Sequence, residues 1–317
     1  MLFASSCLTS EKLDVNVRNF NELTALSVAS QFNKIEIVRE LIKHNKIDIN
    51  LANQFGATAH FLACQQDAFT VVRELLKHPN IDVNVPHVGN GTPLVHAVDV
   101  NNLRIVHELL RHPNIDVNIE DPFGETALYM ASFEGRAPIV RELLKNEKVD
   151  VNITGKSGLT PLHTAICQGH IGVVRELLKC NKVDVNVTND YGDTALVVAL
   201  SVLMVATKDV HKWDFVGEII TQKNVDLNVR GHLGYTLLMW ATLEGNFDMV
   251  SRLLQHDTLD INLKNIAGST ALDIAHNCGH VALATLLRRH RRNSYDWYDT
   301  IQHDASPTKR TKKNDTP

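Results

Sequence analysis

Residues 116–149 read DVNIEDPFGETALYMASFEGRAPIVRELLKNEKV, and this stretch decides the fold. Pro122 and Gly124 predict a hairpin-like turn, because proline and glycine are typical of chain reversals. Thr126 then begins a short helical segment, which Gly135 ends. The next segment has one apolar stripe at helical spacing, formed by Ile139, Val140, Leu143 and Leu144. The stretch is therefore predicted to fold as turn, helix, turn, helix.

Three residue types repeat in register with this unit. The triplet Asp-Val-Asn, or a close variant, begins at Asp14, Asp48, Asp82, Asp116, Asp150, Asp184, Asp226 and Asp260. Six of its seven spacings are 34 residues, and the other is 42. Threonines keep the same pitch at Thr24, Thr58, Thr92, Thr126, Thr160, Thr194, Thr236 and Thr270, and an alanine follows each of them five residues later. An invariably small residue at one helical position predicts close approach of neighbouring backbones.

A period of this length is typical of stacked units that are too small to bury their own apolar faces. Helices below about 12 residues are marginal in isolation, so their stability has to come from neighbouring units. We predict an all-α repeat solenoid over residues 1–290, with about eight repeats. A half-repeat leads it, because Phe3, Ala4, Cys7 and Leu8 lie 34 positions before Ile37, Val38, Leu41 and Ile42. This half-repeat is either a polar-faced N-terminal cap or a sign that the chain is a fragment of a longer array.

The composition is ordinary for a soluble folded protein, with 44% apolar and 21% charged residues among 317. The apolar runs are too short to cross a bilayer, and residues 1–10 lack the features of a secretory signal. Five scattered cysteines favour reduced thiols over a disulfide framework. We therefore expect an intracellular, cytoplasmic protein without membrane insertion.

Residues 291–317 are predicted to form a polar, partly basic and disordered tail. From residue 288 onward eight basic and four acidic residues give a net charge of +4, although the whole chain carries −4. Two interpretations stay open. The tail pairs with the acidic body, or its basic residues Lys309, Arg310, Lys312 and Lys313 serve nuclear import or an anionic partner. Nucleic acid is not an expected partner.

Glycine stands two residues before most threonines of the ladder, which predicts a positive φ at that position. Asn90 and Glu22 are the exceptions. Asparagine tolerates the left-handed region whereas glutamate does not, so we expect a distorted first hairpin.

The sixth unit contains eight extra residues between Ala199 and Phe215, and we expect its first helix to run on there. The insertion is either a docking spur or a tolerated surface insertion. Trp213 aligns with an apolar column of the other units and is predicted to belong to the core.

The stretch GLTPLHTA at residues 158–165 resembles the ankyrin repeat, as do the pairs Gly169-His170, Val173-Val174 and Leu177-Leu178 that follow it. The resemblance covers nearly the whole chain. It implies L-shaped units with projecting hairpins and stacked helices, and a role in protein recognition without catalysis. The usual pitch of the family is about 33 residues. The extra residue here lies in the loop before each triplet, where apolar side chains such as Ile115 are expected to pack.

The family's contact surface is formed by hairpin tips and by the exposed face of the first helices. The resemblance implies protein-binding residues at or beside the tips, Phe55, Phe123, Glu125, Tyr191, Leu233 and Tyr235, and on the first helices, Phe133 and Leu243. Aromatic residues on polar turns are typical of binding hot spots. Some of them either contact a partner or pack against the next hairpin. We expect an unidentified protein partner and a monomeric chain.

Two other classes of function remain. The chain is a structural spacer or a fragment of a larger ankyrin-repeat scaffold, which the leading half-repeat favours. An enzyme is the weakest hypothesis, because no motif brings reactive groups together. His276, Cys278 and His280 do not share one helix face, so neither a metal site nor a cofactor is predicted.

Four asparagines follow a leucine by eight positions and resemble the asparaginyl-hydroxylase substrate pattern found in ankyrin repeats: Asn84, Asn118, Asn152 and Asn186. Stabilisation of turns explains the same asparagines and is the favoured interpretation. A mass increase of one oxygen on these peptides would reveal hydroxylation.

Overall fold

The computed structural model describes residues 14–205 and 213–290. The chain divides into two compact units, residues 1–223 and 224–317, and each is described by itself. In the described ranges both units are helical, and their β-type pairing is confined to isolated bridges in hairpins, such as that between Arg18 and Thr24. The predicted all-α repeat solenoid is confirmed.

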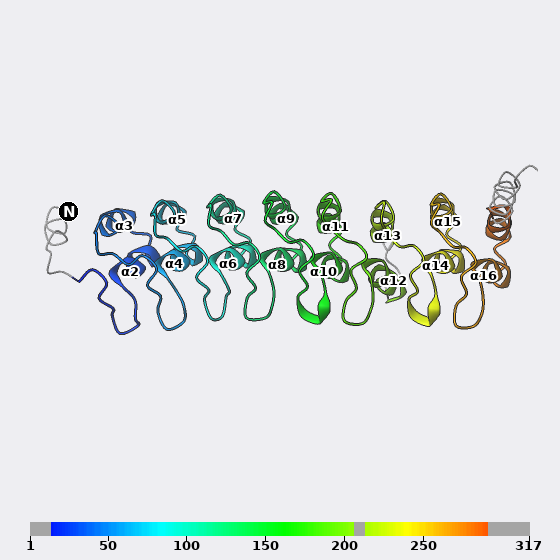
Figure 1. Ribbon diagram of the computed structural model, residues 1–317, viewed down its shortest axis with the longest axis horizontal. Helices are drawn as coiled ribbons and strands as arrows, with labels where there is room; N and C mark the ends of the chain where they lie inside the picture. Colours follow the sequence, from blue (N-terminus) through cyan, green and yellow to red (C-terminus); the bar gives the residue numbers. More distant parts are fainter. Residues whose placement is uncertain (1–13, 206–212, 291–317) are drawn as a thin grey trace, which may run out of the picture. The chain divides into compact units, whose positions relative to one another are not determined.

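Unit 1 stacks its helices in two layers (Figure 1). The first helices of its repeats are α2 (Ala25–Gln31), α4 (Ala59–Gln65), α6 (Pro93–Asp99), α8 (Ala127–Phe133), α10 (Pro161–Cys167) and α12 (Ala195–Val205). The second helices are α3 (Ile35–Leu41), α5 (Phe69–Leu75), α7 (Leu103–Leu110), α9 (Ala137–Leu143), α11 (Ile171–Leu178) and α13 (Asp214–Ile219). A short 3₁₀ turn, η1 (Lys156–Gly158), lies in the fifth hairpin.

Unit 2 repeats the same order of elements. It contains η2 (His232–Gly234), α14 (Leu237–Leu243), α15 (Phe247–Leu253) and α16 (Ala271–Asn277), and residues 281–290 are helical. α14 packs against both α15 and α16.

The two ladders of the sequence have separate roles at the first helices. Each ladder threonine is an N-cap: Thr58 Oγ1, for example, accepts from the Phe61 backbone N–H at 3.1 Å. Each ladder alanine is buried where first helices meet, as Ala131 is between α8 and α10. A larger side chain there would force the helices apart. The prediction of close backbone approach is confirmed.

The asparagine of most triplets joins its loop to the loop of the next repeat. Asn118 Nδ2 donates to the Lys148 carbonyl at 2.8 Å, and Asn118 Oδ1 accepts from the Asp150 N–H at 2.9 Å. Asp116 Oδ1 holds the Asn118 backbone N–H at 3.0 Å. The same pair of bonds between loops is made by Asn16, Asn50, Asn84, Asn152 and, in unit 2, Asn228.

Substituting Asn118→Ala is expected to lower the free energy of unfolding by about 1–2 kcal/mol, since two hydrogen bonds between repeats are lost in a half-exposed loop. Urea unfolding followed by circular dichroism measures the loss. The control is Asn21→Ala on the exposed first hairpin, which should change stability by less than about 0.5 kcal/mol. Similar losses in both variants would show that the loop bonds add nothing.

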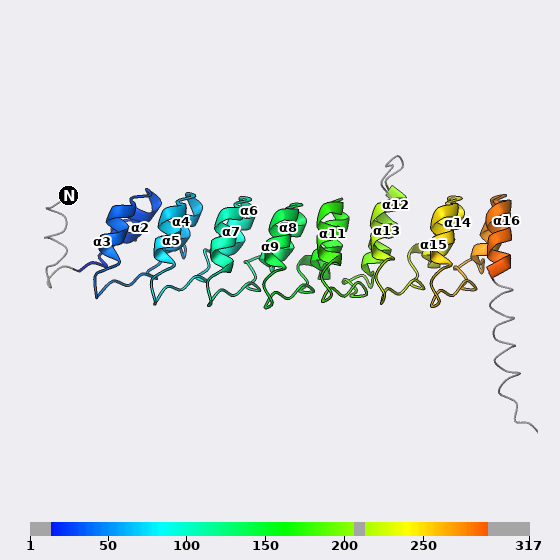
Figure 2. The ribbon, with the colours of Figure 1, turned by 90° about the horizontal axis from the view of Figure 1, so that it is seen from above.

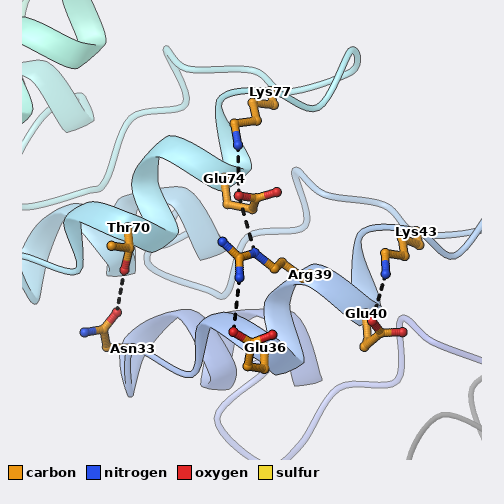
Figure 3. A network of polar contacts seen from close by, with 8 residues as sticks. All are labelled: Asn33, Glu36, Arg39, Glu40, Lys43, Thr70, Glu74 and Lys77. Carbon is orange, nitrogen blue, oxygen red and sulfur yellow. Dashed lines mark hydrogen bonds and ion pairs between the residues drawn. The ribbon is translucent and has the colours of Figure 1, made fainter.

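The second helices are joined by ion pairs on their outer face. Figure 3 shows Arg39 of α3 between Glu36 of its own helix, at 3.1 Å, and Glu74 of α5, at 3.6 Å. Lys77 also pairs with Glu74, at 3.0 Å. The corresponding pairs further along the unit are Arg73–Glu108, His107–Glu142, Arg141–Glu176 and Arg175–Glu218. Arg141 and Lys179 lower the pKa of Glu176 to about 2 through hydrogen bonds. The acids of this face therefore have their counter-charges within the chain.

Two hairpin predictions are corrected. The left-handed conformation expected of Asn90 is taken by the next residue, Gly91, with φ 65°. This hairpin alone has a glycine at that position, and glycine adopts a positive φ without strain. Glu22 is left-handed, with φ 57°, but its hairpin is regular. The Asn19 N–H donates to the Leu23 carbonyl at 3.0 Å, as the equivalent residues do elsewhere. Local hydrogen bonds therefore outweigh the strain at Glu22.

The sixth repeat confirms one prediction and contradicts another. α12 has 11 residues where the other first helices of unit 1 have seven, so the first helix does run on. Residues 206–212 of the insertion lie outside the described residues. Trp213 is half-buried rather than core. Phe69 and Ile171 in the same column are also half-buried, because the second helices begin at the margin of the repeat interface.

Candidate protein-binding surface

The hairpins of unit 1 project to the same side of its helices (Figure 1). Seen from above, the loops between its repeats lie at one end of the helices (Figure 2). An Asn or Asp side chain closes several of these hairpins. Asn53 Oδ1 accepts from the backbone N–H groups of Phe55 and Ala57, at 3.0 and 2.9 Å. Asn19, Asp121 and Asn189 do the same. This local bonding fixes the direction of the tip residue that it encloses.

In the fifth hairpin Gly155 stands where several other hairpins have the Asn or Asp that accepts these two hydrogen bonds, and the hairpin has a different local conformation. It forms η1, and Ser157 takes φ 60°. The Ser157 carbonyl then accepts from the Asp190 N–H of the next hairpin at 3.2 Å. A similar bond joins the Val88 N–H to the Phe55 carbonyl at 2.9 Å. Adjacent hairpins are thus tied together at their tips.

The predicted tip residues are exposed. The exposed fraction is 52% for Phe55, 73% for Phe123 and 78% for Tyr191 in unit 1. Leu233 in unit 2 is exposed as well. Exposure of a large apolar side chain on a tied hairpin argues against the interpretation that it packs on the next hairpin.

Three exposed tip residues escaped the sequence prediction: Phe20 and Val88 in unit 1 and Ile266 in unit 2. They stand one position earlier in the repeat than Phe55 and Phe123. The signal was an apolar residue at either of two adjacent tip positions, which a single alignment column cannot show.

The other predicted contact residues are less exposed. Phe133 ends α8, so it lies at the opposite end of that helix from the Phe123 hairpin, and the structure does not bring the two together. Its side chain is partly exposed, as is that of Leu243 at the end of α14. Tyr235 is half-buried and packs on Trp240, with ring centroids 4.9 Å apart. Packing therefore accounts for Tyr235 without a partner.

The surroundings of Glu125 are acidic. Burial raises the pKa of its carboxyl, the charge of Asp121 raises it further, and Lys156 of the next hairpin opposes them. Glu125 therefore interacts electrostatically with Asp121 of its own hairpin and with Lys156 of the next one. Glu125 contributes charge to this surface rather than an exposed anchor.

His163 connects the helix layer to the Tyr191 hairpin. Its Nε2 lies 3.2 Å from the Asp193 carbonyl, and its Nδ1 accepts from the Thr160 N–H at 3.3 Å. Because a carbonyl only accepts, Nε2 carries the proton and the ring is neutral. Burial lowers the pKa of His163, which favours this neutral form. The bond fixes the hairpin that carries Tyr191.

Residues suited to other chemistry are dispersed. In the part of the chain that the structure describes, no group of three or more His, Cys, Asp or Glu side chains is placed to hold a metal ion. No helix in the same ranges is long and apolar enough to cross a bilayer. Cys64, Cys167, Cys180 and Cys278 are free thiols.

Asn84, Asn118 and Asn152 use both ends of their amide in bonds to the next loop. The Asn186 N–H donates to Asp184 Oδ1 at 2.9 Å. These contacts give the asparagines the turn-stabilising role that was favoured. Their hydroxylation stays a prediction.

Comparison with known families identifies the class of protein. Models of ankyrin repeats match residues 4–87 and 203–296 (three copies), 109–165 and 143–199 (many copies) and 89–119 (a single repeat). The chain belongs to the ankyrin repeat family. Ankyrin repeats are generally protein–protein interaction modules, and proteins of the family are typically not enzymes.

Solved structures show the same fold. The crystal structure of the ankyrin repeat domain of Bcl-3, described as a unique member of the IkappaB protein family, is 24% identical with a TM-score of 0.59. The match covers 68% of this chain and 91% of the Bcl-3 chain. The ankyrin repeat protein EF0377 is 20% identical with a TM-score of 0.55, covering 67% of this chain and 100% of its own.

Proposed function

We propose that this chain is a non-catalytic adaptor or scaffold module that binds a partner protein through its hairpin tips and the exposed face of its first helices. The observation that carries the proposal is the row of exposed aromatic tips in unit 1, Phe55, Phe123 and Tyr191. Large apolar groups on solvated turns gain stability only when another molecule covers them. Leu233, Phe133 and Leu243 are the further apolar contacts, and Glu125 and Tyr235 flank them.

The double variant Phe123→Ala/Tyr191→Ala is expected to weaken partner binding by several hundredfold and so to lose most of its captured partner, since truncating hot-spot aromatics costs about 2 kcal/mol or more each. Quantitative affinity purification from the native cell compares it with the wild type.

Leu103→Ala/Phe247→Ala is the matched control, because these exposed apolar residues lie on the second helices. Thermal unfolding checks that all variants fold. Equal recovery of every protein by the two double variants would remove Phe123 and Tyr191 from the site.

The alternative is a structural spacer or a piece of a larger repeat scaffold, and one observation favours it. Val17, Phe32 and Ile37 of the first described repeat are exposed and border a groove of about 610 Å³. Val71 and Ile105, which align with Ile37, are fully buried. This face has the character of a surface that stacks against a preceding second helix, which either the predicted half-repeat before residue 14 or an upstream repeat would supply. In-frame repeats upstream in the gene would favour this alternative.

The proposal includes a monomeric chain that works in the cytoplasm without nucleic acid. Family members are commonly intracellular. The boundary of the solenoid near residue 290 and nuclear import through the basic residues at 309–313 stay predictions, because the tail lies outside the described residues.

A further inference from the structure

Carboxylates surround the two most exposed predicted aromatic tips of unit 1. We define the central hairpins as residues 119–125, 153–159 and 187–193. They carry Phe123 and Tyr191, and five acids against one lysine give a net charge of −4: Glu120, Asp121, Glu125, Asp190, Asp193 and Lys156. The preceding hairpins lack this surplus. Arg18 pairs with Glu22 at 3.7 Å in the first, and residues 51–57 and 85–91 contain neither acids nor Lys or Arg.

The acids of the central hairpins differ from those of the second helices. Glu74, Glu176 and Glu218 each pair with an arginine from the preceding repeat. Glu142 pairs with Lys145 of its own repeat. Across the described residues, the five central-hairpin carboxylates have no such ion pair, and Glu120 and Asp190 are exposed. This negative charge, without paired cations in the described ranges, lies beside two exposed aromatic rings, and it favours a partner with positively charged groups.

From this arrangement we infer that the central hairpins bind an extended, arginine-containing segment of a partner protein, an inference that rests on the proposed function. Arginine fits better than lysine, because a guanidinium both stacks on an aromatic ring and forms a bidentate pair with a carboxylate. The chain makes the stacking contact itself: the Arg104 guanidinium lies 3.5 Å from the ring centroid of Phe69 in the preceding repeat.

The spacing of the two aromatic residues sets the spacing of the ligand. Phe123 and Tyr191 lie two repeats apart, and helix layers about 10 Å apart place their hairpins about 20 Å from each other. An extended chain advances about 3.3 Å per residue, so about six residues cover this distance. The bond between the Asp190 N–H and the Ser157 carbonyl, at 3.2 Å, holds two of the three hairpins together. The surface is therefore matched to two arginines about six positions apart.

Fluorescence anisotropy with the full chain tests the inference. The probe is a labelled Gly/Ser peptide with two arginines about six residues apart, and the matched peptide has glutamates at those positions. We expect the arginine peptide to bind, with an affinity that falls as salt rises. Glu120→Gln/Asp190→Asn should weaken binding about fivefold, and Lys156→Gln should strengthen it about twofold. The control Glu36→Gln/Glu40→Gln, on exposed acids of α3, should leave binding unchanged.

Equal binding of the glutamate peptide, or unchanged binding by Glu120→Gln/Asp190→Asn, would overturn the inference. Its failure is distinguishable from that of the proposed function. If Phe123→Ala/Tyr191→Ala loses its cellular partner while the arginine peptide does not bind, the hairpin surface stands and its basic ligand does not. If neither experiment shows an effect, both proposals fall.

Discussion

Truncation of Leu143 to alanine is expected to lower the free energy of unfolding by about 2–5 kcal/mol. Leu143 lies on α9 and is fully buried, and α9 packs against α8 of its own repeat and against α7 and α11 of the neighbouring repeats. The cavity would therefore weaken two repeat interfaces at once. An array has no separate core to compensate, because each repeat contacts only its neighbours. Denaturant unfolding followed by circular dichroism measures the loss.

Leu103→Ala removes the same atoms from a leucine that is 41% exposed at the start of α7. Its expected cost is below about 1 kcal/mol, since little apolar surface returns to water. A cost for Leu143→Ala as small as that for Leu103→Ala would contradict the view that burial between repeats supplies the stability.

The fold was predictable because its determinants repeat. A threonine that caps a helix, an alanine where helices meet and an asparagine between loops each occupy one position in every unit, so the pitch alone shows them. The asparagine bonds themselves were not predicted as contacts between repeats. Asn118 is separated in the sequence by 30 residues from Lys148 and by 32 from Asp150, so the repeat pattern does not show that its amide meets both of them.

The candidate site was predictable only in part, because hairpin tips are less constrained than helices. A buried position tolerates one kind of side chain, so its column is regular. A tip residue faces solvent, and its apolar group stands at either of two positions, as Phe20 and Phe55 show. The prediction that Trp213 belongs to the core was wrong for the opposite reason. Its column in the repeat is apolar, but residues at the start of a second helix are only half-buried. The unpaired charge of the central hairpins could not be predicted, because the sequence does not show which acids form ion pairs with basic residues.

Acidification is expected to destabilise unit 1 through a buried histidine. His60 on α4 is fully buried, and burial lowers its pKa to about 4, with a smaller contribution from the charge of His112. Within the described residues its Nδ1 has no hydrogen-bond partner, and its Nε2 lies 3.9 Å from Cys64 Sγ. His96 on α6 is also buried, and burial lowers its pKa while the charge of Asp99 opposes this. Protonation of either ring places a charge in an apolar interface.

The sign follows from proton binding by the two states. Unfolded histidine takes up a proton below about pH 6.5, whereas folded His60 stays neutral until the pH approaches 4. The free energy of unfolding should be highest above pH 6.5. As the pH is lowered from 6.5 to 4, His60 alone should reduce it by about 1.4 kcal/mol per pH unit, or about 3 kcal/mol in all. The carboxylates with lowered pKa, such as that of Glu176, contribute only at lower pH, since an unfolded carboxyl titrates near 4.5.

Urea unfolding at several pH values between 7 and 4.5 measures this slope. His60→Leu removes the titrating ring, so the variant should lose less stability than the wild type as the pH falls, whatever its stability at pH 7. His232→Gln, at an exposed hairpin position in unit 2, should leave the slope unchanged. If His60→Leu and the wild type lose stability in parallel, His60 is not the acid-sensitive group, because a buried neutral histidine must contribute its own proton uptake to unfolding.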